Sequence, residues 1–214
     1  MAWPEALLEF ARTVGRLKTV VRQGWVDRGV AAPESVADHT YRAAMLAWTL
    51  GAAAGLDTNR LIKLMLVHDL AEARVGDATP YERLMDAARN PEAVRRWREL
   101  VTPDQVAAAK LEKHDRERTA LHGIVSDLPG NLAGELRALG EEYARRDSAE
   151  GKFAAQIDKI EALLQAVEYR EAGQPSDVEN FLASAREEVT HPLLEAFVDA
   201  LIAPGQLERG SDRS

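Results

Sequence analysis

The chain has 214 residues, 46% of them hydrophobic, so it is long enough to bury one sizeable core. Its net charge of −8 provides no general attraction for nucleic acid or anionic lipid, and cysteine is absent, which excludes disulfides, thiolate nucleophiles and cysteine metal sites. Any phosphate-bearing substrate must therefore be captured by a local metal ion or by a few local cations. No signal-peptide pattern or membrane-length apolar run is evident, so we expect a cytoplasmic protein without membrane or nucleic-acid polymer partners.

The first half of the chain predicts three helices, because helix-forming residues dominate and β-branched runs are scarce. The first runs over residues 4–22, with a proline at a position that suits the first helical turn. Residues 23–34 show no clear periodicity. The next two helices are expected over residues 35–55 and 58–73, and a Gly- and Pro-containing break follows at residues 75–80.

Capping boxes organise the second half. Thr102–Gln105 matches this pattern and opens a predicted helix that reaches about residue 125, before a turn at residues 129–131. Asp147–Glu150 opens a helix to about residue 172, Ser176–Glu179 is a third box, and a last helix follows Pro192. The chain is therefore expected to be all-α.

Three predicted helices carry polar side chains where an apolar residue is expected. His39 lies on an apolar stripe, His68 and Asp69 follow a buried run, and Asp158 lies at the edge of another apolar face. Alone, His39 is better explained as a hydrogen-bonded core residue, and Asp158 as a partner for Lys or Arg. Asp69 is harder to explain, because a buried carboxylate is costly unless it is paired or binds a metal. Together, two imidazoles and two carboxylates suit one divalent ion, without choosing between manganese, cobalt, iron, zinc and magnesium.

The longer sequence segments around these residues resemble those of a known protein family. His39, His68-Asp69 and Asp158 resemble the H…HD…D signature of the HD-domain superfamily, and VHDLAEARVGD resembles its metal segment. GWV followed by PESVADH, and AEGKFAAQIDKIEALLQAVEY, resemble segments of the HD-domain 5′-deoxynucleotidases and their eukaryotic relatives. The similarity extends from about Gly15 to Pro192. It implies a single HD-domain helical bundle over residues 1–202, a homodimer, and one divalent ion held by His39, His68, Asp69 and Asp158. Residues 203–214 are polar and contain glycine, so we expect them to form a flexible tail.

The resemblance also implies an acidic pair, Glu72 and Asp77, that orients or activates water near the metal. If one helix continued through this segment, Glu72 would share a face with His68, four residues earlier. Asp77 follows a glycine in a loop that can turn back over the site. The alternative explanations are an exposed helical glutamate and an ordinary turn residue.

Trp25 matches a family tryptophan that packs against the substrate sugar, and it lies 14 positions before His39. The bacterial nucleotidases carry an arginine directly before this tryptophan. Gly24 stands there in this chain, so Arg22 or Arg28 must supply any cation that binds phosphate. The alternative role of Trp25 is ordinary aromatic packing. An indole against C2′ would favour deoxyribose over ribose.

The resemblance implies a metal-dependent phosphohydrolase that releases phosphate from (deoxy)nucleoside 5′-monophosphates. A cyclic-nucleotide or other phosphodiesterase on the same metal site, and a catalytically silent nucleotide-binding protein, are the alternatives. Two-metal versions of the fold add histidines between the HD pair and the last aspartate. Only His114 and His122 lie in that interval, in a charged segment predicted to be a solvated helix face, so we expect one metal ion.

Overall fold

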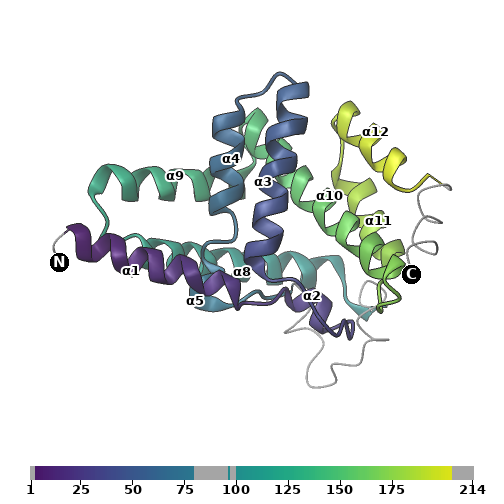
Figure 1. The fold of residues 1–214 in the computed structure, drawn as a ribbon, viewed down its shortest axis with the longest axis horizontal. Coiled ribbons are helices and arrows are strands. Elements are labelled where there is room, and N and C mark those ends of the chain that lie inside the picture. The colour runs from purple at the N-terminus through teal and green to yellow at the C-terminus, as the bar shows by residue number, and fades with distance from the viewer. Residues whose placement is uncertain (1–2, 80–95, 97–99, 204–214) are drawn as a thin grey trace.

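The computed structural model describes residues 3–79, 96 and 100–203, and these residues form an all-α bundle, as predicted (Figure 1). Within these ranges, β-type pairing is limited to an isolated antiparallel bridge between Val21 and Ser35. None of the described helices is both long enough and apolar enough to cross a membrane. The helices are α1 (Trp3–Gly15), the 3-10 turn η1 (Arg16–Lys18), α2 (Gln23–Val26), α3 (Val36–Ala53), α4 (Thr58–Val67), α5 (Glu72–Val75), α8 (Pro103–Ile124), α9 (Gly130–Arg145), α10 (Ala149–Glu171), α11 (Val178–Glu188) and α12 (Pro192–Leu201).

Helix α10 lies at the centre of the packing and contacts α3, α4, α9, α11 and α12. Its apolar face is fully buried at Ile157, Ile160 and Leu163, as expected for a helix surrounded on several sides. Helices α3 and α4 run side by side as a hairpin (Figure 1). They approach closely at Gly51, where a Cβ atom would overlap the buried side chain of Leu61.

The first helix is shorter than predicted. It ends at Gly15, and after η1 the backbone becomes extended, so that Arg22 has a φ of −67° and a ψ of 108°. Glycine and the β-branched residues that follow it weaken the helix, and the amide of Val36 pairs with the carbonyl of Val20 instead. This turn brings Arg22 toward the start of α3.

The predicted helix over residues 58–73 is two helices, α4 and α5, separated by a turn over residues 68–71. In a continued helix, the carbonyl of Met65 would accept the amide of Asp69. Here that carbonyl accepts the Nδ1–H of His68 at 2.7 Å. The side chain thus replaces the backbone as donor and the helix stops. Glu72 and His68 therefore do not share one helical face, and that prediction was wrong.

Of the three predicted capping boxes, the one at Thr102 is confirmed, with both reciprocal hydrogen bonds present. The second is displaced by one residue, because Ser148 rather than Asp147 caps α10 by accepting the amide of Gly151 at 2.8 Å. The third is wrong: Ser176 donates its hydroxyl to the carbonyl of Ala166, and Asp177 occupies the N-cap of α11 without a side-chain cap. The last helix begins at Pro192 as predicted, and the predicted tail lies outside the described residues beyond Ala203.

Candidate metal centre

His39 projects from the first turn of α3 into the interior and is fully buried. Ser35 and Asp38 form a capping box that fixes this turn. The Nδ1 atom of His39 contacts a carboxylate oxygen of Glu161 on α10, and the second oxygen of Glu161 accepts Arg42 Nε at 2.8 Å. With Nδ1 held in this way, Nε2 of His39 faces the centre of the bundle.

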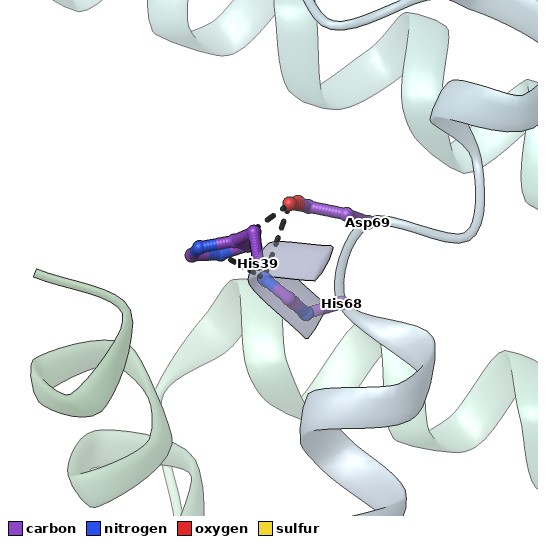
Figure 2. A group of neighbouring side chains, drawn as sticks. All are labelled: His39, His68 and Asp69. Carbon is purple, nitrogen blue, oxygen red and sulfur yellow. Dashed lines mark hydrogen bonds and ion pairs between the residues drawn. The ribbon is translucent and has the colours of Figure 1, made fainter. Parts of the chain in front are cut away.

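His68 and Asp69 lie at the end of α4, where the helix stops. His68 donates Nδ1–H to the carbonyl of Met65, so its Nε2 also faces the centre. That Nε2 lies 3.2 Å from Nε2 of His39 and 3.1 Å from Oδ2 of Asp69 (Figure 2). The ligand atoms of these three residues all lie within 4.8 Å of one another.

Asp158 reaches the same point from α10. Its Oδ1 lies 3.3 Å from Nε2 of His39, and Oδ2 of Asp69 lies 3.8 Å from the same nitrogen. An ion with bonds of about 2.1 Å holds neighbouring ligand atoms about 3.0–3.4 Å apart in octahedral or tetrahedral geometry. Three of the four separations, at 3.1–3.3 Å, are of this size, and the separation between His39 and Asp69 is longer. His39, His68 and Asp69 thus form a candidate site for a divalent ion, and Asp158 lies beside it. Three segments far apart in the sequence supply these residues.

The charge balance of this cluster favours ionised carboxylates. Burial opposes ionisation of Asp69, but His68, Arg22 and His39 hold its pKa well below the usual range. Burial and Arg22 oppose protonation of His39, yet its contacts with Asp158 and Glu161 raise its pKa to about 9. Two anionic oxygens next to two imidazoles attract a cation, and a metal ion that binds here displaces the proton of His39.

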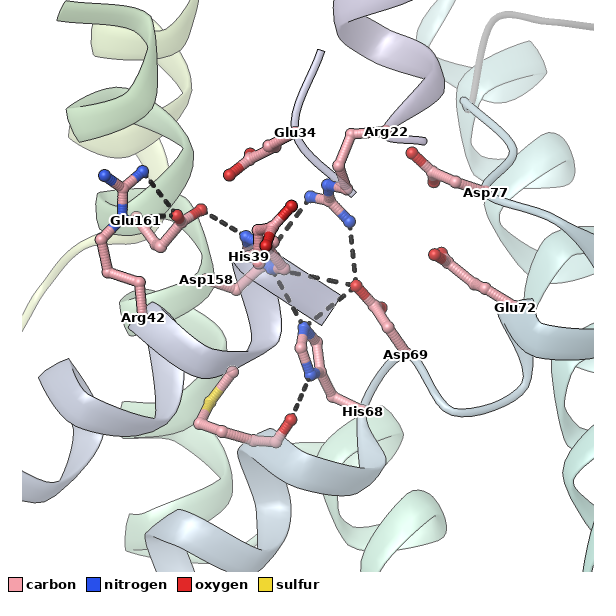
Figure 3. A network of polar contacts seen from close by, with 12 residues as sticks. Arg22, Glu34, His39, Arg42, His68, Asp69, Glu72, Asp77, Asp158 and Glu161 are labelled. Atoms are coloured by element: carbon pink, nitrogen blue, oxygen red, sulfur yellow. Dashed lines mark hydrogen bonds and ion pairs between the residues drawn. The ribbon is translucent and has the colours of Figure 1, made fainter. Parts of the chain in front are cut away.

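Arg22 lies against this cluster from the turn before α2. Its Nη1 donates to Asp69 Oδ2 at 2.9 Å, and its Nη2 lies 3.9 Å from Asp158 Oδ1 (Figure 3). Arg28 is placed differently: it is 5% exposed, donates to the carbonyl of Gly24 at 2.9 Å and lies over the ring of Phe181. The two candidate arginines thus occupy different environments, and Arg22 is the one beside the candidate metal ligands.

Glu72 and Asp77 lie on the opposite side of Asp69 from His39 (Figure 3). Glu72 is 1% exposed at the start of α5, and burial together with Asp69 and Asp77 raises its pKa well above the usual range. Asp77 follows Gly76, whose φ of 75° turns the chain back toward the site. There Asp77 accepts the backbone amide of Gln23 at 2.8 Å.

Trp25 is 2% exposed and packs between Phe181 and Tyr169, with ring centroids 4.5 and 5.1 Å away. Its Nε1–H donates to Glu34 at 3.0 Å, and burial and Glu161 raise the pKa of Glu34 to about 7. The indole nonetheless contributes to the wall of a cavity of about 480 Å³, which three of the candidate metal ligands, His68, Asp69 and Asp158, also line. This cavity is large enough for a small organic molecule.

Helix α8 forms part of the wall of the same cavity, so the prediction of a wholly solvated face is wrong. His122 is exposed as predicted, whereas His114 is half-buried and lines the cavity. Neither belongs to either of the two groups of candidate metal ligands in the described part of the chain, which are His39, His68 and Asp69, and Glu34, His39 and Glu161. One turn of α8 instead directs Lys113 and Glu117 inward.

Four polar residues of the site were not identified from the sequence: Glu34, Arg42, Lys113 and Glu161. Glu161 follows Asp158 by three residues on the same helix, and Arg42 follows His39 by three, so helical spacing from a ligand would have indicated both. Lys113 gave no such signal, because its segment is charged and shows no apolar stripe.

The chain is similar to known proteins in both sequence and fold. A family model described as an HD domain matches residues 14–197. The chain is 38% identical over 199 residues to the 5′-deoxynucleotidase HDDC2 of Homo sapiens, covering 92% of this chain and 85% of that protein. It is 32% identical to the 5′-deoxynucleotidase hdd1 of Schizosaccharomyces pombe, covering 92% and 89%. A conserved hypothetical protein of Pyrococcus furiosus superposes with a TM-score of 0.64 at 25% identity, covering 91% of this chain and 98% of that one.

Proposed function

The chain belongs to the HD-domain family, and from this premise we propose that it is a metal-dependent 5′-deoxynucleotidase, which releases phosphate from deoxynucleoside 5′-monophosphates. The observation that carries the proposal is the cluster of His39, His68 and Asp69, with Asp158 beside His39. His68, Asp69 and Asp158 line a cavity. Relatives named 5′-deoxynucleotidases match nine-tenths of the chain at 32–38% identity, which supports this substrate class.

The four ligands hold one divalent ion, for which manganese, cobalt, iron, zinc and magnesium are all chemically suitable. When bound, such an ion polarises a phosphoryl oxygen and lowers the pKa of water. The protein orients both imidazoles through their Nδ1 atoms, which face away from the candidate metal site. The Glu161 carboxylate accepts Nδ1–H of His39, and the Met65 carbonyl accepts Nδ1–H of His68. Both imidazoles are thereby aligned before the substrate arrives.

Glu72 accepts the proton of the attacking water in this proposal, and Asp77 assists. A general base works best when its pKa lies near the working pH. Burial, Asp69 and Asp77 all raise the pKa of Glu72, which moves it in that direction. The fixed contact of Asp77 with the Gln23 amide ties this acidic pair to the segment that carries Arg22.

Arg22, rather than Arg28, is proposed to bind the phosphate. Its guanidinium already lies within reach of two metal ligands, whereas Arg28 is engaged with the Gly24 carbonyl and the Phe181 ring. A planar guanidinium is well suited to two phosphoryl oxygens. Trp25 is proposed to provide the apolar wall beside the sugar, because its edge lines the cavity while its N–H is occupied by Glu34.

The test is a phosphate-release screen over deoxynucleoside and nucleoside 5′-monophosphates and simple phosphodiesters, each with several divalent metals. The expected result is release from deoxynucleoside monophosphates by the wild type and a loss of about a hundredfold or more in Glu72→Gln, the scale of general acid–base catalysis. Cleavage of diesters alone would identify a phosphodiesterase instead. Tight nucleotide binding without turnover would identify a silent binding protein.

Three further properties complete the proposal. The HD domain spans residues 1–202, the protein is a homodimer, and it acts in the cytoplasm on a small nucleotide rather than on a nucleic-acid polymer or at a membrane. The net charge of −8 supports the absence of polymer and lipid partners. Analytical ultracentrifugation measures the oligomeric state, and a single monomeric species across micromolar concentrations would contradict the homodimer.

A further inference from the structure

Lys113 reaches the acidic side of the metal centre from α8, the helix that covers the cavity. Its Nζ lies 3.5 Å from a carboxylate oxygen of Glu72, 3.9 Å from Asp77 and 3.2 Å from Glu117, one turn further along α8. The lysine side chain is 27% exposed and lines the cavity. One ammonium group therefore faces three carboxylates.

In the described part of the chain, the buried carboxylate of Glu72 has few partners other than Lys113. This carboxylate is fully buried, and among the described residues neither of its oxygens has a hydrogen-bond partner. The anionic form of such a group is costly unless a cation lies close by. Of the two cations that act most strongly on Glu72, Lys113 and Arg22, only Lys113 lies within ion-pair distance in the structure.

We infer that Lys113 is a positioning residue for the proposed reaction, which holds the buried carboxylate of Glu72 by an ion pair and directs it at the cavity. The inference rests on the proposed role of Glu72 and extends it to a residue on a different helix. Lys113 is itself held in place by Glu117 at 3.2 Å. This i, i+4 pair fixes an otherwise flexible lysine side chain.

All the charged groups around Glu72 have to be weighed together. Asp69 and Asp77 raise the pKa of Glu72, and Lys113 and Arg22 lower it, after the dominant effect of burial. Glu117 also lies in this cluster, whereas the charged side chains of α1 and η1, which pack on α5 as well, are exposed. Removing Lys113 therefore leaves the carboxylates facing one another with Arg22 as their remaining close cation.

In Lys113→Met, the Glu72 carboxylate loses the group that holds it at the cavity. At neutral pH, kcat should fall about ten- to a hundredfold, as when an outer partner of a functional group is lost. KM should change less than about threefold, since the lysine acts through Glu72. Lys113→Arg should restore most of kcat, because it keeps a cation at this position.

Lys110 provides the matched control. It lies almost one turn earlier on α8 and lines the same cavity, so Lys110→Met removes an equal charge from the same wall. The fall in kcat should be much smaller in this variant than in Lys113→Met. An unchanged kcat in Lys113→Met, or an equal fall in both variants, would overturn the inference. An unchanged kcat with KM raised tenfold or more would also overturn it, and would make Lys113 a direct phosphate ligand.

A second measurement separates this inference from the proposed function, because it needs no turnover. The urea midpoint of unfolding is compared for wild type, Glu72→Gln, Lys113→Met and the double variant. Neutralising Glu72 should raise the midpoint more in the Lys113→Met background than in the wild type, since the charge there has lost its partner. Equal increments in both backgrounds would overturn the pairing. If the two substitutions affect the urea midpoint non-additively but the protein hydrolyses no nucleotide, the pairing of Lys113 with Glu72 stands and the proposed nucleotidase function is wrong.

Discussion

Glu161 determines which nitrogen of His39 faces the metal centre. Its carboxylate contacts Nδ1, and Arg42 holds the carboxylate in turn. A histidine whose Nδ1–H donates to a carboxylate presents a more basic Nε2 to a metal. The buried Glu161 is thus part of the metal centre although it is not positioned to be a ligand of the proposed ion.

Glu161→Gln is predicted to weaken binding of Mn²⁺ or Co²⁺ about ten- to a hundredfold, because His39 loses its anionic partner. Isothermal titration calorimetry on the metal-free protein measures the dissociation constant. Glu168→Gln is the control, since Glu168 also pairs with Arg42 but is exposed on the surface. Unchanged affinity in Glu161→Gln would remove this residue from the metal centre.

Trp25 is predicted to favour deoxyribose over ribose. An apolar wall offers no acceptor to a 2′-hydroxyl, and the indole N–H is already donated to Glu34. An unpaired hydroxyl costs about 1–3 kcal/mol, or about ten- to a hundredfold in kcat/KM. The measurement is kcat/KM for dAMP and AMP in the wild type, Trp25→Ala and Trp25→Phe.

The preference for dAMP should survive in Trp25→Phe, which keeps an apolar ring, and shrink in Trp25→Ala. Thermal melting of both variants is needed beside the kinetics, because Trp25 also packs on Phe181 and Tyr169. Equal kcat/KM for the two substrates in the wild type would refute the deoxy preference. A preference that persists in a folded Trp25→Ala would assign it to other residues.

At the scale of the elements, the interruption of α4 matters most for the site. The His68 side chain takes the carbonyl that the helix would have used, and the chain turns before α5 begins. This turn places Asp69 among the ligands and Glu72 beyond it, facing Lys113. The hydrogen bond from His68 to the Met65 carbonyl therefore has two effects. It orients the His68 ring itself, and it ends the helix so that the chain can turn toward Glu72.

The α3–α4 hairpin, which carries His39 and His68, depends on the close approach at Gly51. Gly51→Ala is predicted to lower the free energy of unfolding by about 0–2 kcal/mol. Overpacking against the buried Leu61 costs about 1–3 kcal/mol, and the better helix propensity of alanine returns about 1 kcal/mol. Urea denaturation measures the difference.

Gly134→Ala is the matched control for this substitution. Gly134 is also helical, but it is exposed, and a Cβ atom there would meet nothing within 4 Å. This variant should gain about 0.5–1 kcal/mol from helix propensity alone. If both substitutions changed the free energy of unfolding by the same amount, the close contact between Gly51 and Leu61 would not contribute to stability.

At the scale of the whole molecule, the metal centre joins α3, the end of α4 and α10, three parts of the chain that meet only in the folded state. A ligand that binds only this state stabilises it by about 2.7 kcal/mol at a hundredfold excess over its Kd. For a chain of this length, that corresponds to a rise in Tm of about 5–11 °C. Differential scanning calorimetry with Mn²⁺ and with a chelator tests this prediction.

Asp158→Asn should remove most of the metal-dependent rise in Tm, and His114→Ala should retain it. His114 lines the cavity without joining the ligand cluster, which makes it a stringent control for the single-metal interpretation. Loss of the rise in His114→Ala would instead indicate that this histidine binds metal, and would support two-metal chemistry.

The sequence by itself determined the helical class, most helix starts and the candidate ligands. These follow from local signals: Thr102 caps its own helix, and His39, His68 and Asp158 stand out because a polar group on an apolar helical face is unusual. Local spacing from His39 and Asp158 could also have indicated Arg42 and Glu161.

Only the tertiary structure decided how these groups act on one another. Whether Arg22 or Arg28 approaches the ligands depends on an extended turn and a bridge between Val21 and Ser35, which local helix propensity did not indicate. Lys113 meets Glu72 across 41 positions of sequence, from a helix whose charged composition resembles a solvated surface. Burial and charge pairing arise from contacts between distant segments, so their effect on a carboxylate becomes visible only when the chain is folded.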